Sequence, residues 1–261
     1  WDAYARALLD ALLDAQGRGV AVALLVDGFG QRLGGTLMST ADRQALAGRF
    51  DALRAAGATV TLYRPAYAVQ RLLGGGQHVK IQAADTGEAI VGSSNITKSS
   101  FEGWNELSVA VQGPIVRTLL ESWPRIGGVV SAGHLTELDG VSAGAPVCDL
   151  DYWFCNPNLD QGPFGALGWR GANAVTDRMV EMLDAARSTV SITAFYFKPV
   201  PVLMEAVLGA ARRGVAVEVF HSHREALPAT DLAWIASAAG YARLLEAGVT
   251  IFENRRGEHS K

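Results

Sequence analysis

The chain has 261 residues, 49% of them apolar and 19% charged, so it can bury a sizeable core as one large or two smaller domains, and extensive disorder is excluded. Its formal net charge of −3 excludes the overall basic excess of a general nucleic-acid binder, while leaving room for a local basic patch. No apolar run approaches the ~20 residues that a membrane-spanning helix needs.

The two cysteines and the first residue say little about function. Cys148 and Cys155 stand in no CxxC or Cys/His spacing, so we interpret them as ordinary thiols and expect no metal site from them. The chain starts at Trp1 rather than Met, which leads us to expect a fragment or a processed chain.

The first predicted elements are an amphipathic helix and a buried strand. Leucines recur at helical spacing in ALLDALLDAQG, residues 7–17, and Gly19 is placed to end the helix. Residues 20–26, VAVALLV, form a short apolar run that is typical of a strand in a parallel sheet.

The same order of elements returns later in the chain. Residues 202–220, VLMEAVLGAARRGVAVEVF, repeat the helix, the Arg-Gly pair and the strand, and residues 53–65 parallel residues 244–256. Each copy then reaches a His-x-Lys sequence, at His78-Val79-Lys80 and at His259-Ser260-Lys261. This internal duplication predicts an α/β protein of two similar halves, each with a mixed, largely parallel sheet flanked by helices.

A glycine-rich stretch, residues 125–171, lies between the copies and is interpreted as the connection between two domains. We therefore expect a first half over residues 1–140 and a second half over residues 141–261. Residues 145–154 have the pattern of a possible strand within this connection.

The second half is predicted to continue with a helix over residues 174–186, a strand over residues 189–197 and a further helix starting near Pro201. The strand over 189–197 has no counterpart before Trp1, so we expect that the first half lacks its opening strand. The second half is expected to stop within its own His-x-Lys motif.

The segment QHVKIQAADTGEAIVGSSN, residues 77–95, is predicted to form a β-hairpin. Alternation along a strand places His78 and Lys80 on one face. With a two-residue turn, Asn95 lies opposite His78 and Ser93 lies opposite Lys80, whereas a bulge at Gly87 would shift this register by one residue.

These side chains suit the binding of a phosphate group. A lysine supplies charge, serine and asparagine supply hydrogen-bond donors, and a histidine supplies a nucleophile or a proton carrier. As residue types alone, the same side chains also fit a polar strand face without function, and both interpretations stay open.

The spacing then resembles a known family. His78-x-Lys80, four residues, Asp85, six residues and Gly92-Ser93-x-Asn95 match the HxK(x)4D(x)6GSxN signature of the phospholipase D superfamily. Six fixed residues at fixed spacing form a far more specific pattern than most short motifs. The repeated segments and GWNELSVAVQGPIV, residues 103–116, resemble the bacterial branch of cardiolipin synthases and phosphatidyltransferases.

The resemblance implies one active site built from two motifs, with His259 and Lys261 beginning the second motif. In this family one histidine attacks phosphorus and forms a phosphohistidine, and the other serves as general acid and then general base, without a metal or any other cofactor. We assign His78 as the nucleophile and His259 as the general acid and base. Lys80, Lys261 and Asn95 are expected to hold the phosphate, with Ser93 a weaker candidate.

Two acidic residues complete the implied site. Asp85 resembles the motif aspartate, which orients a histidine in relatives, and we expect this to be the histidine of the opposite half. Glu106 resembles an acidic residue that hydrogen-bonds the first histidine in relatives, and its alternative interpretation is a solvated charge at a strand edge.

Other candidate residues keep two interpretations each. His134 lies in the connection and has no assigned role. His221 and His223 follow a strand of the second half, where they either line a cleft or form a surface turn. Asp27 follows the first strand and either faces substrate or caps a turn.

Three functions follow from these residues. The first is a phosphodiesterase or phosphatidyltransferase that acts on phospholipid head groups, with peripheral membrane contact at the cytoplasmic face of the bacterial inner membrane. The second is a nuclease of the same superfamily; Asp85 argues against its tyrosyl-DNA phosphodiesterase branch, whose motifs lack this residue. The third is a phosphate-binding module without turnover. The motif lacks the basic flanks that are common in cardiolipin synthases, so the head group stays open. The acceptor alcohol, the oligomeric state and the cellular location also stay open, and the membrane location applies only if the chain is similar in function to a cardiolipin synthase.

Overall fold

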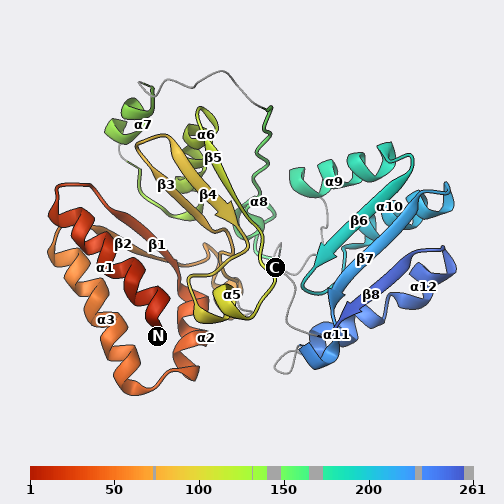
Figure 1. Ribbon diagram of the computed structural model, residues 1–261, viewed down its shortest axis with the longest axis horizontal. Helices are drawn as coiled ribbons and strands as arrows, with labels where there is room; N and C mark the ends of the chain where they lie inside the picture. Colours follow the sequence, from red (N-terminus) through yellow and green to blue (C-terminus); the bar gives the residue numbers. More distant parts are fainter. Residues whose placement is uncertain (73–74, 131, 140–147, 165–172, 227–230, 256–261) are drawn as a thin grey trace. The chain divides into compact units, whose positions relative to one another are not determined.

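The computed structural model describes residues 1–72, 75–130, 132–139, 148–164, 173–226 and 231–255. The chain divides into two compact units, the first made of Trp1–Lys98 and Ser108–Ala166, the second of Ser99–Leu107 and Leu167–Lys261. Figure 1 labels the helices and strands, which form an α/β protein as predicted. The predicted division between residues 140 and 141 lies outside the described residues and stays a prediction.

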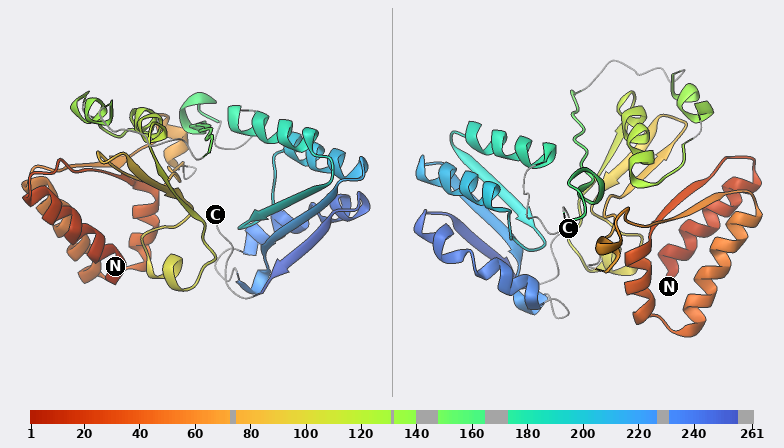
Figure 2. Two further views of the ribbon diagram at one scale, coloured as in Figure 1. Left: turned by 45° about the horizontal axis from the view of Figure 1, so that its top comes forward. Right: turned by 180° about the vertical axis from the view of Figure 1, so that it is seen from behind.

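The first unit opens with helices packed on a two-stranded parallel sheet. Its elements are α1 Ala3–Gly17, β1 Ala23–Asp27, α2 Gly28–Leu37, α3 Thr40–Ala55 and β2 Thr59–Tyr63. The α1 and α3 helices lie on the same face of β1–β2 (Figure 2), and the side chains of Leu9 and Leu53 are buried there. Asp2 caps α1 by accepting hydrogen bonds from the Tyr4 and Ala5 backbone N–H groups, both at 3.0 Å.

The rest of the first unit contains an antiparallel sheet. Its elements are α4 Ala68–Leu72, β3 Ile81–Ala84, β4 Glu88–Gly92, β5 Ser108–Gln112, α6 Ile115–Ser122, η1 Trp123–Ile126, α7 Ala132–Asp139 and α8 Pro157–Asp160. The strand order is β3-β4-β5. The α6 helix buries Val116 and Leu119 against Ala89 of β4, which forms the second core of this unit.

The hairpin turn between β3 and β4 has three residues rather than two. Ala84 pairs with Glu88, and Gly87 has a φ of +78°, the left-handed conformation that glycine adopts without strain. The predicted pairing of Asn95 with His78 is therefore wrong by one residue, in the direction that a bulge at Gly87 produces. The strands are also shorter than predicted, because the ladder ends at the pair Ile81 and Val91.

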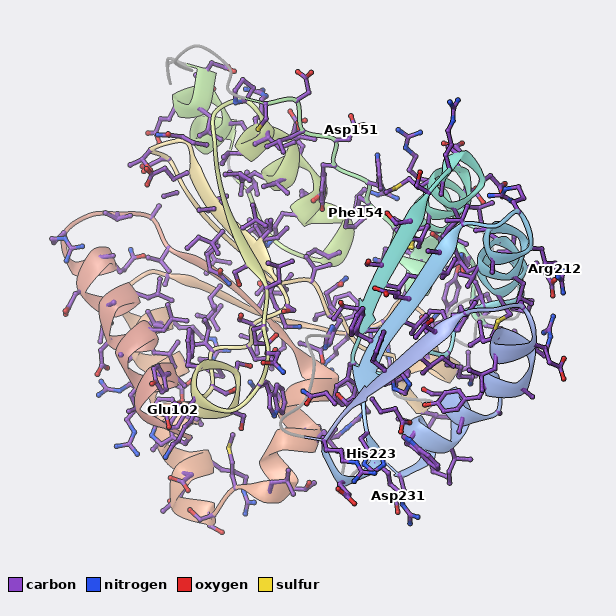
Figure 3. The ribbon with its side chains drawn as sticks, turned by 45° about the vertical axis from the view of Figure 1, so that its right-hand side comes forward. Glu102, Asp151, Phe154, Arg212, His223 and Asp231 are labelled. Atoms are coloured by element: carbon purple, nitrogen blue, oxygen red, sulfur yellow. The ribbon has the colours of Figure 1, made fainter. Side chains whose placement is uncertain are left out.

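The second unit is a three-stranded parallel sheet with helices. Its elements are α5 Lys98–Glu102, α9 Ala174–Ala185, β6 Thr189–Ala194, α10 Pro201–Arg212, β7 Ala216–Ser222, η3 Arg224–Ala226, α11 Asp231–Ala238, α12 Tyr241–Glu246 and β8 Thr250–Asn254. The α5 helix begins at the last residue of the first unit. Pro201 occupies the first turn of α10, as predicted, and Figure 3 labels Arg212 at the end of that helix.

One face of this sheet is covered by helices. Leu208 of α10 and Leu244 of α12 are fully buried against Val217 and Val219 of β7. Phe220 lies on the other face, because side chains alternate along a strand, and its ring stacks on Phe252 with 4.6 Å between the centroids.

The internal duplication is visible in matching backbone geometry. Gly19 and Gly214, which end α1 and α10, have φ values of +89° and +87°. After each glycine the next N–H bonds back to the helix, from Val20 to Ala15 O at 3.1 Å and from Val215 to Ala210 O at 3.2 Å.

The strand register is repeated as well. Ala23 pairs with Thr59 in the first unit, and the aligned residues Glu218 and Thr250 pair in the second. Both halves therefore contain the same helix–strand frame with the same register.

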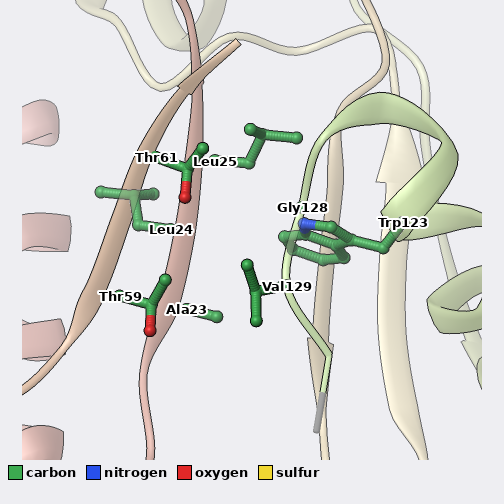
Figure 4. Close-up of a pocket in the computed structure, with 8 residues that line it drawn as sticks. All are labelled: Ala23, Leu24, Leu25, Thr59, Thr61, Trp123, Gly128 and Val129. Carbon is green, nitrogen blue, oxygen red and sulfur yellow. The ribbon is translucent and has the colours of Figure 1, made fainter.

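The second face of β1–β2 is closed by an aromatic ring. Figure 4 shows the Trp123 ring at Gly128, facing Leu25 and Thr61 of the sheet. A Cβ atom at Gly128 would lie 1.2 Å from the Trp123 ring atom Cδ1, so only glycine allows this packing. The small space between the ring and the strands is lined by Ala23, Leu24, Leu25, Thr59, Thr61, Trp123, Gly128 and Val129.

The strand predicted over residues 145–154 is not formed in its described part, residues 148–154. This stretch has no ladder partner, and it is held instead by side chains. Tyr152 Oη lies 3.0 Å from Ser122 Oγ, and its ring packs on the core beneath α6. Within the described residues, no helix is both long and apolar enough to cross a bilayer.

Candidate active site

The motif residues gather at the open end of the β3–β4 hairpin. His78 and Lys80 precede β3, while Ser93 and Asn95 follow β4, and the ladder ends at Ile81 and Val91 between them. The His78 side chain is exposed, whereas Lys80, Ser93 and Asn95 are half-buried. The hairpin therefore places these four motif residues at the same end of the β3–β4 ladder.

The backbone before His78 is held by an aspartate that lies 50 residues earlier. Asp27 ends β1, and its Oδ1 accepts a hydrogen bond from the Gln77 N–H at 2.7 Å. Its Oδ2 accepts from the Gly30 N–H and so caps α2. Of the two interpretations left open for Asp27, the structure shows capping.

The Gln77 side chain continues this chain of bonds to the motif. Its Oε1 accepts from the His78 N–H at 3.1 Å and from the Val79 N–H at 3.3 Å. Lys80 Nζ donates to the His78 carbonyl oxygen at 2.9 Å. Three consecutive bonds therefore define the path of the backbone that carries His78.

Gly76 allows a close approach to the Asp27 carboxylate in this arrangement. A Cβ atom at this position would lie 3.0 Å from Asp27 Oδ2 and 3.2 Å from Oδ1. A side chain here would require the carboxylate or the backbone to shift by a few tenths of an ångström. The glycines before His78 thus include one whose role is close approach to a carboxylate.

The two acidic residues of the predicted site, Asp85 and Glu106, lie in different loops. Asp85 is exposed in the hairpin turn, and β3 separates it from His78 of the same unit. Glu106 is half-buried, two residues before Ser108, the first residue of β5. His259 and Lys261 lie outside the described residues, so their assigned roles stay predictions.

The second unit contains a polar cluster that sequence reasoning did not identify. His221 is fully buried, so a surface turn is the wrong interpretation for this residue. Its Nε2 lies 2.6 Å from Tyr241 Oη, and that hydroxyl donates to Glu253 Oε1. Trp234 Nε1 donates to the same oxygen at 2.7 Å, and His223, labelled in Figure 3, lies 3.7 Å from Glu253 Oε2.

This cluster shifts the ionisation of its members. Burial alone would raise the pKa of Glu253, but hydrogen bonds from Tyr241 and Trp234 and the two nearby histidines outweigh it, so the pKa is lowered. Burial, and then the hydrogen bond to Glu253, raise the pKa of Tyr241. Glu253 is therefore a carboxylate at neutral pH and Tyr241 is a neutral donor to it.

The cluster belongs to the second unit alone. In the aligned frame of the first unit, the positions of His221 and Glu253 are occupied by Val26 and Leu62. Within the described residues, no group of three or more His, Cys, Asp or Glu side chains is arranged to hold a metal ion.

A duplicated α/β frame whose hairpin presents HxK, a turn aspartate and GSxN defines a protein of the phospholipase D class. A family model described as "Cardiolipin synthase, PLD-like domain" matches residues 4–123 and 179–261. The chain belongs to this family, and the resemblance drawn from its motif is confirmed.

Curated relatives include cardiolipin synthase B of Escherichia coli K12, which is 27% identical over 273 residues and covers 98% of this chain. Cardiolipin synthase B of Salmonella typhimurium LT2 is also 27% identical, over 275 residues and 98% of this chain. The chain spans 59% of the length of each relative. Among solved structures, a polyphosphate kinase from Porphyromonas gingivalis superposes with a TM-score of 0.45 and 13% identity, covering 82% of this chain and 31% of that one.

Proposed function

We propose that this chain processes phosphodiesters in the manner of a cardiolipin synthase or phospholipase D, through a phosphohistidine at His78. One observation carries the proposal. The bonds from Asp27 through Gln77 hold the backbone at His78 while its side chain stays exposed, with Lys80 beside it. A nucleophile needs this combination of a fixed position and open access to its substrate.

The proposed reaction has two balanced steps. In the first, an imidazole nitrogen of His78 forms a bond to phosphorus, the bond to the leaving oxygen breaks, and His259 donates a proton to that oxygen. In the second, His259 takes a proton from water or an alcohol, whose oxygen attacks phosphorus and releases His78. Water gives hydrolysis, and an alcohol gives phosphatidyl transfer.

The remaining motif residues have supporting roles in this proposal. Lys80, Lys261 and Asn95, with Ser93, stabilise negative charge on the phosphoryl oxygens. Asp85 orients the histidine of the opposite half, and Glu106 bonds the nucleophilic histidine. The proposal assigns residues 1–140 and 141–261 to the two phospholipase D-like halves, and it uses no metal or other cofactor.

The proposed substrate is a phospholipid, because the relatives named above are cardiolipin synthases. Peripheral contact with a bacterial inner membrane, at its cytoplasmic face, follows from a substrate of that kind. A superfamily nuclease would use the same chemistry on a nucleic acid, and a phosphate-binding module would use the same residues without turnover.

The test is turnover of phosphatidylglycerol, phosphatidylcholine and single-stranded DNA by the wild type and by His78→Ala. We expect lipid turnover that His78→Ala lowers by at least about 1,000-fold, while the matched variant His134→Ala retains it. A lipid labelled with ³²P should leave an alkali-stable, acid-labile label on the wild type and on His134→Ala, but not on His78→Ala.

Three results would contradict the proposal. Cleavage of DNA with neither lipid touched would favour a nuclease. Binding of phosphatidylglycerol without any turnover would favour a phosphate-binding module. Full activity in His78→Ala would exclude this residue as the nucleophile.

A further inference from the structure

Three of the exposed leucines in the first unit belong to two short helices. Leu33 and Leu37 of α2 are 56% and 87% exposed, and Leu72, which ends α4, is 88% exposed. Leu33 and Leu37 are four residues apart and so share one face of α2. A single exposed leucine is ordinary, but a group of them marks a surface that contacts something apolar.

Three arginines lie in or next to the same two helices. Arg32 Nη2 donates to the Arg71 carbonyl oxygen at 3.5 Å, which places α4 beside α2. The Arg71 Nε group donates to the Pro65 carbonyl at 3.2 Å. Arg64 Cγ would lie 3.9 Å from a Cβ atom placed at Gly28, the first residue of α2.

No acidic residue occurs in residues 28–41 or 64–72, so no carboxylate of these segments neutralises the arginines. We name this surface the α2–α4 ledge, defined by Arg32, Leu33, Leu37, Arg64, Arg71 and Leu72.

The ledge adjoins the candidate active site within the first unit. Asp27 caps α2 through Gly30 and bonds the Gln77 N–H, one residue before His78. Asp27 therefore links the first turn of α2 to the backbone that carries the proposed nucleophile.

We infer that the α2–α4 ledge docks on an anionic lipid surface, an inference that rests on the proposed function at His78. Exposed leucines enter the boundary between head groups and acyl chains, while guanidinium groups bind lipid phosphates. A nucleic acid would use the arginines but would give the three leucines no role, so the combination favours lipid. Docking through this surface brings lipid phosphodiesters to His78.

The test is flotation of the whole chain with vesicles of phosphatidylcholine, with and without phosphatidylglycerol. We expect tighter binding to vesicles with phosphatidylglycerol, reduced by salt. Leu37→Ser with Leu72→Ser should lower the partition coefficient at least about tenfold. Arg32→Gln with Arg71→Gln should lower it about 25-fold, or about fivefold for each arginine.

The controls are Leu232→Ser, at a leucine 81% exposed on α11, and Arg212→Gln, at an exposed arginine of α10. Both should bind as the wild type does. Thermal unfolding of every variant checks that the fold is kept. Leu33→Ser serves as a second leucine variant, with a milder expected loss of vesicle binding.

Wild-type binding by the double leucine variant would overturn the inference. The inference would also be overturned if the arginine variant lost binding to both vesicles and single-stranded DNA while the leucine variant kept both. The ledge would then be a general polyanion surface. The proposed function is judged separately. Vesicle binding without any phosphodiester cleavage would refute that function and leave the docking inference intact. Cleavage of bis(p-nitrophenyl) phosphate without preference for anionic vesicles would support the proposed function and refute the docking inference.

Discussion

Asp27 joins two segments that are far apart in the sequence. One carboxylate oxygen caps α2 at Gly30, and the other accepts from Gln77, the residue before the proposed nucleophile. Hydrogen bonds that involve a charged group contribute about 1.5–3 kcal/mol each, so this residue has a large effect on local order. We interpret it as a positioning residue, because it acts on His78 through the backbone.

Replacement of Asp27 tests this interpretation at the scale of a residue. Asp27→Asn keeps one acceptor oxygen, and Asp27→Ala keeps none, so hydrogen exchange at the Gln77 amide should quicken in that order. We expect activity to fall about 10- to 100-fold, mainly in kcat, as for a misplaced catalytic group.

The matched control for Asp27 is Asp42→Asn, which alters the Ser39–Asp42 cap of α3 in the same unit. This variant should leave Gln77 exchange unchanged. Equal exchange in Asp27→Ala and the wild type would contradict the positioning role.

At the scale of elements, glycines at and within helices affect the stability of the fold in opposite ways. Gly214 follows α10 with a φ of +87°, where a Cβ atom costs about 1–2 kcal/mol. Gly209, inside the same helix, has helical backbone and only the flexible end of Arg213 near its Cβ position, at 3.5 Å. The same residue type therefore stabilises one position of this helix and weakens another.

Two alanine substitutions should have opposite effects on stability. Gly214→Ala should lower the free energy of unfolding by about 1–2 kcal/mol, and Gly209→Ala should raise it by up to about 1 kcal/mol. Urea denaturation of both variants measures the difference. A stabilising effect of Gly214→Ala would show that this helix end relaxes without the left-handed residue.

At the scale of the whole molecule, two units share one frame and differ in what they add to it. Within the described residues, the first contains the motif hairpin, and the second contains the cluster of His221, Tyr241 and Glu253. The hydrophobic cores of the two units are separate: the first unit has one around Leu53 and one around Val116, and the second has one around Leu208. The two units should therefore respond differently to pH.

The lowered pKa of Glu253 predicts acid sensitivity of the second unit. A carboxyl whose pKa is lower in the folded than in the unfolded state stabilises the fold above its ordinary pKa of 4.5, and this contribution is lost as the pH falls through the folded value.

Fluorescence of Trp234, which bonds Glu253, reports the urea midpoint of this region as a function of pH. In Glu253→Gln the fall of the urea midpoint at acid pH should be smaller. Glu205→Gln, at an exposed partner of Arg243, should behave as the wild type. An unchanged acid dependence in Glu253→Gln would assign the effect to other carboxyls.

Sequence alone was sufficient for the duplicated α/β frame, the helix ends at Gly19 and Gly214 and the spacing of the motif around His78. These features depend on local periodicity and on glycine geometry, which neighbouring residues determine. Tertiary structure decided the bond from Asp27 to Gln77, the burial of His221 and the coil at residues 148–154. Each of these depends on contacts between residues far apart in the chain, or on which face of a strand is covered, and local pattern contains neither.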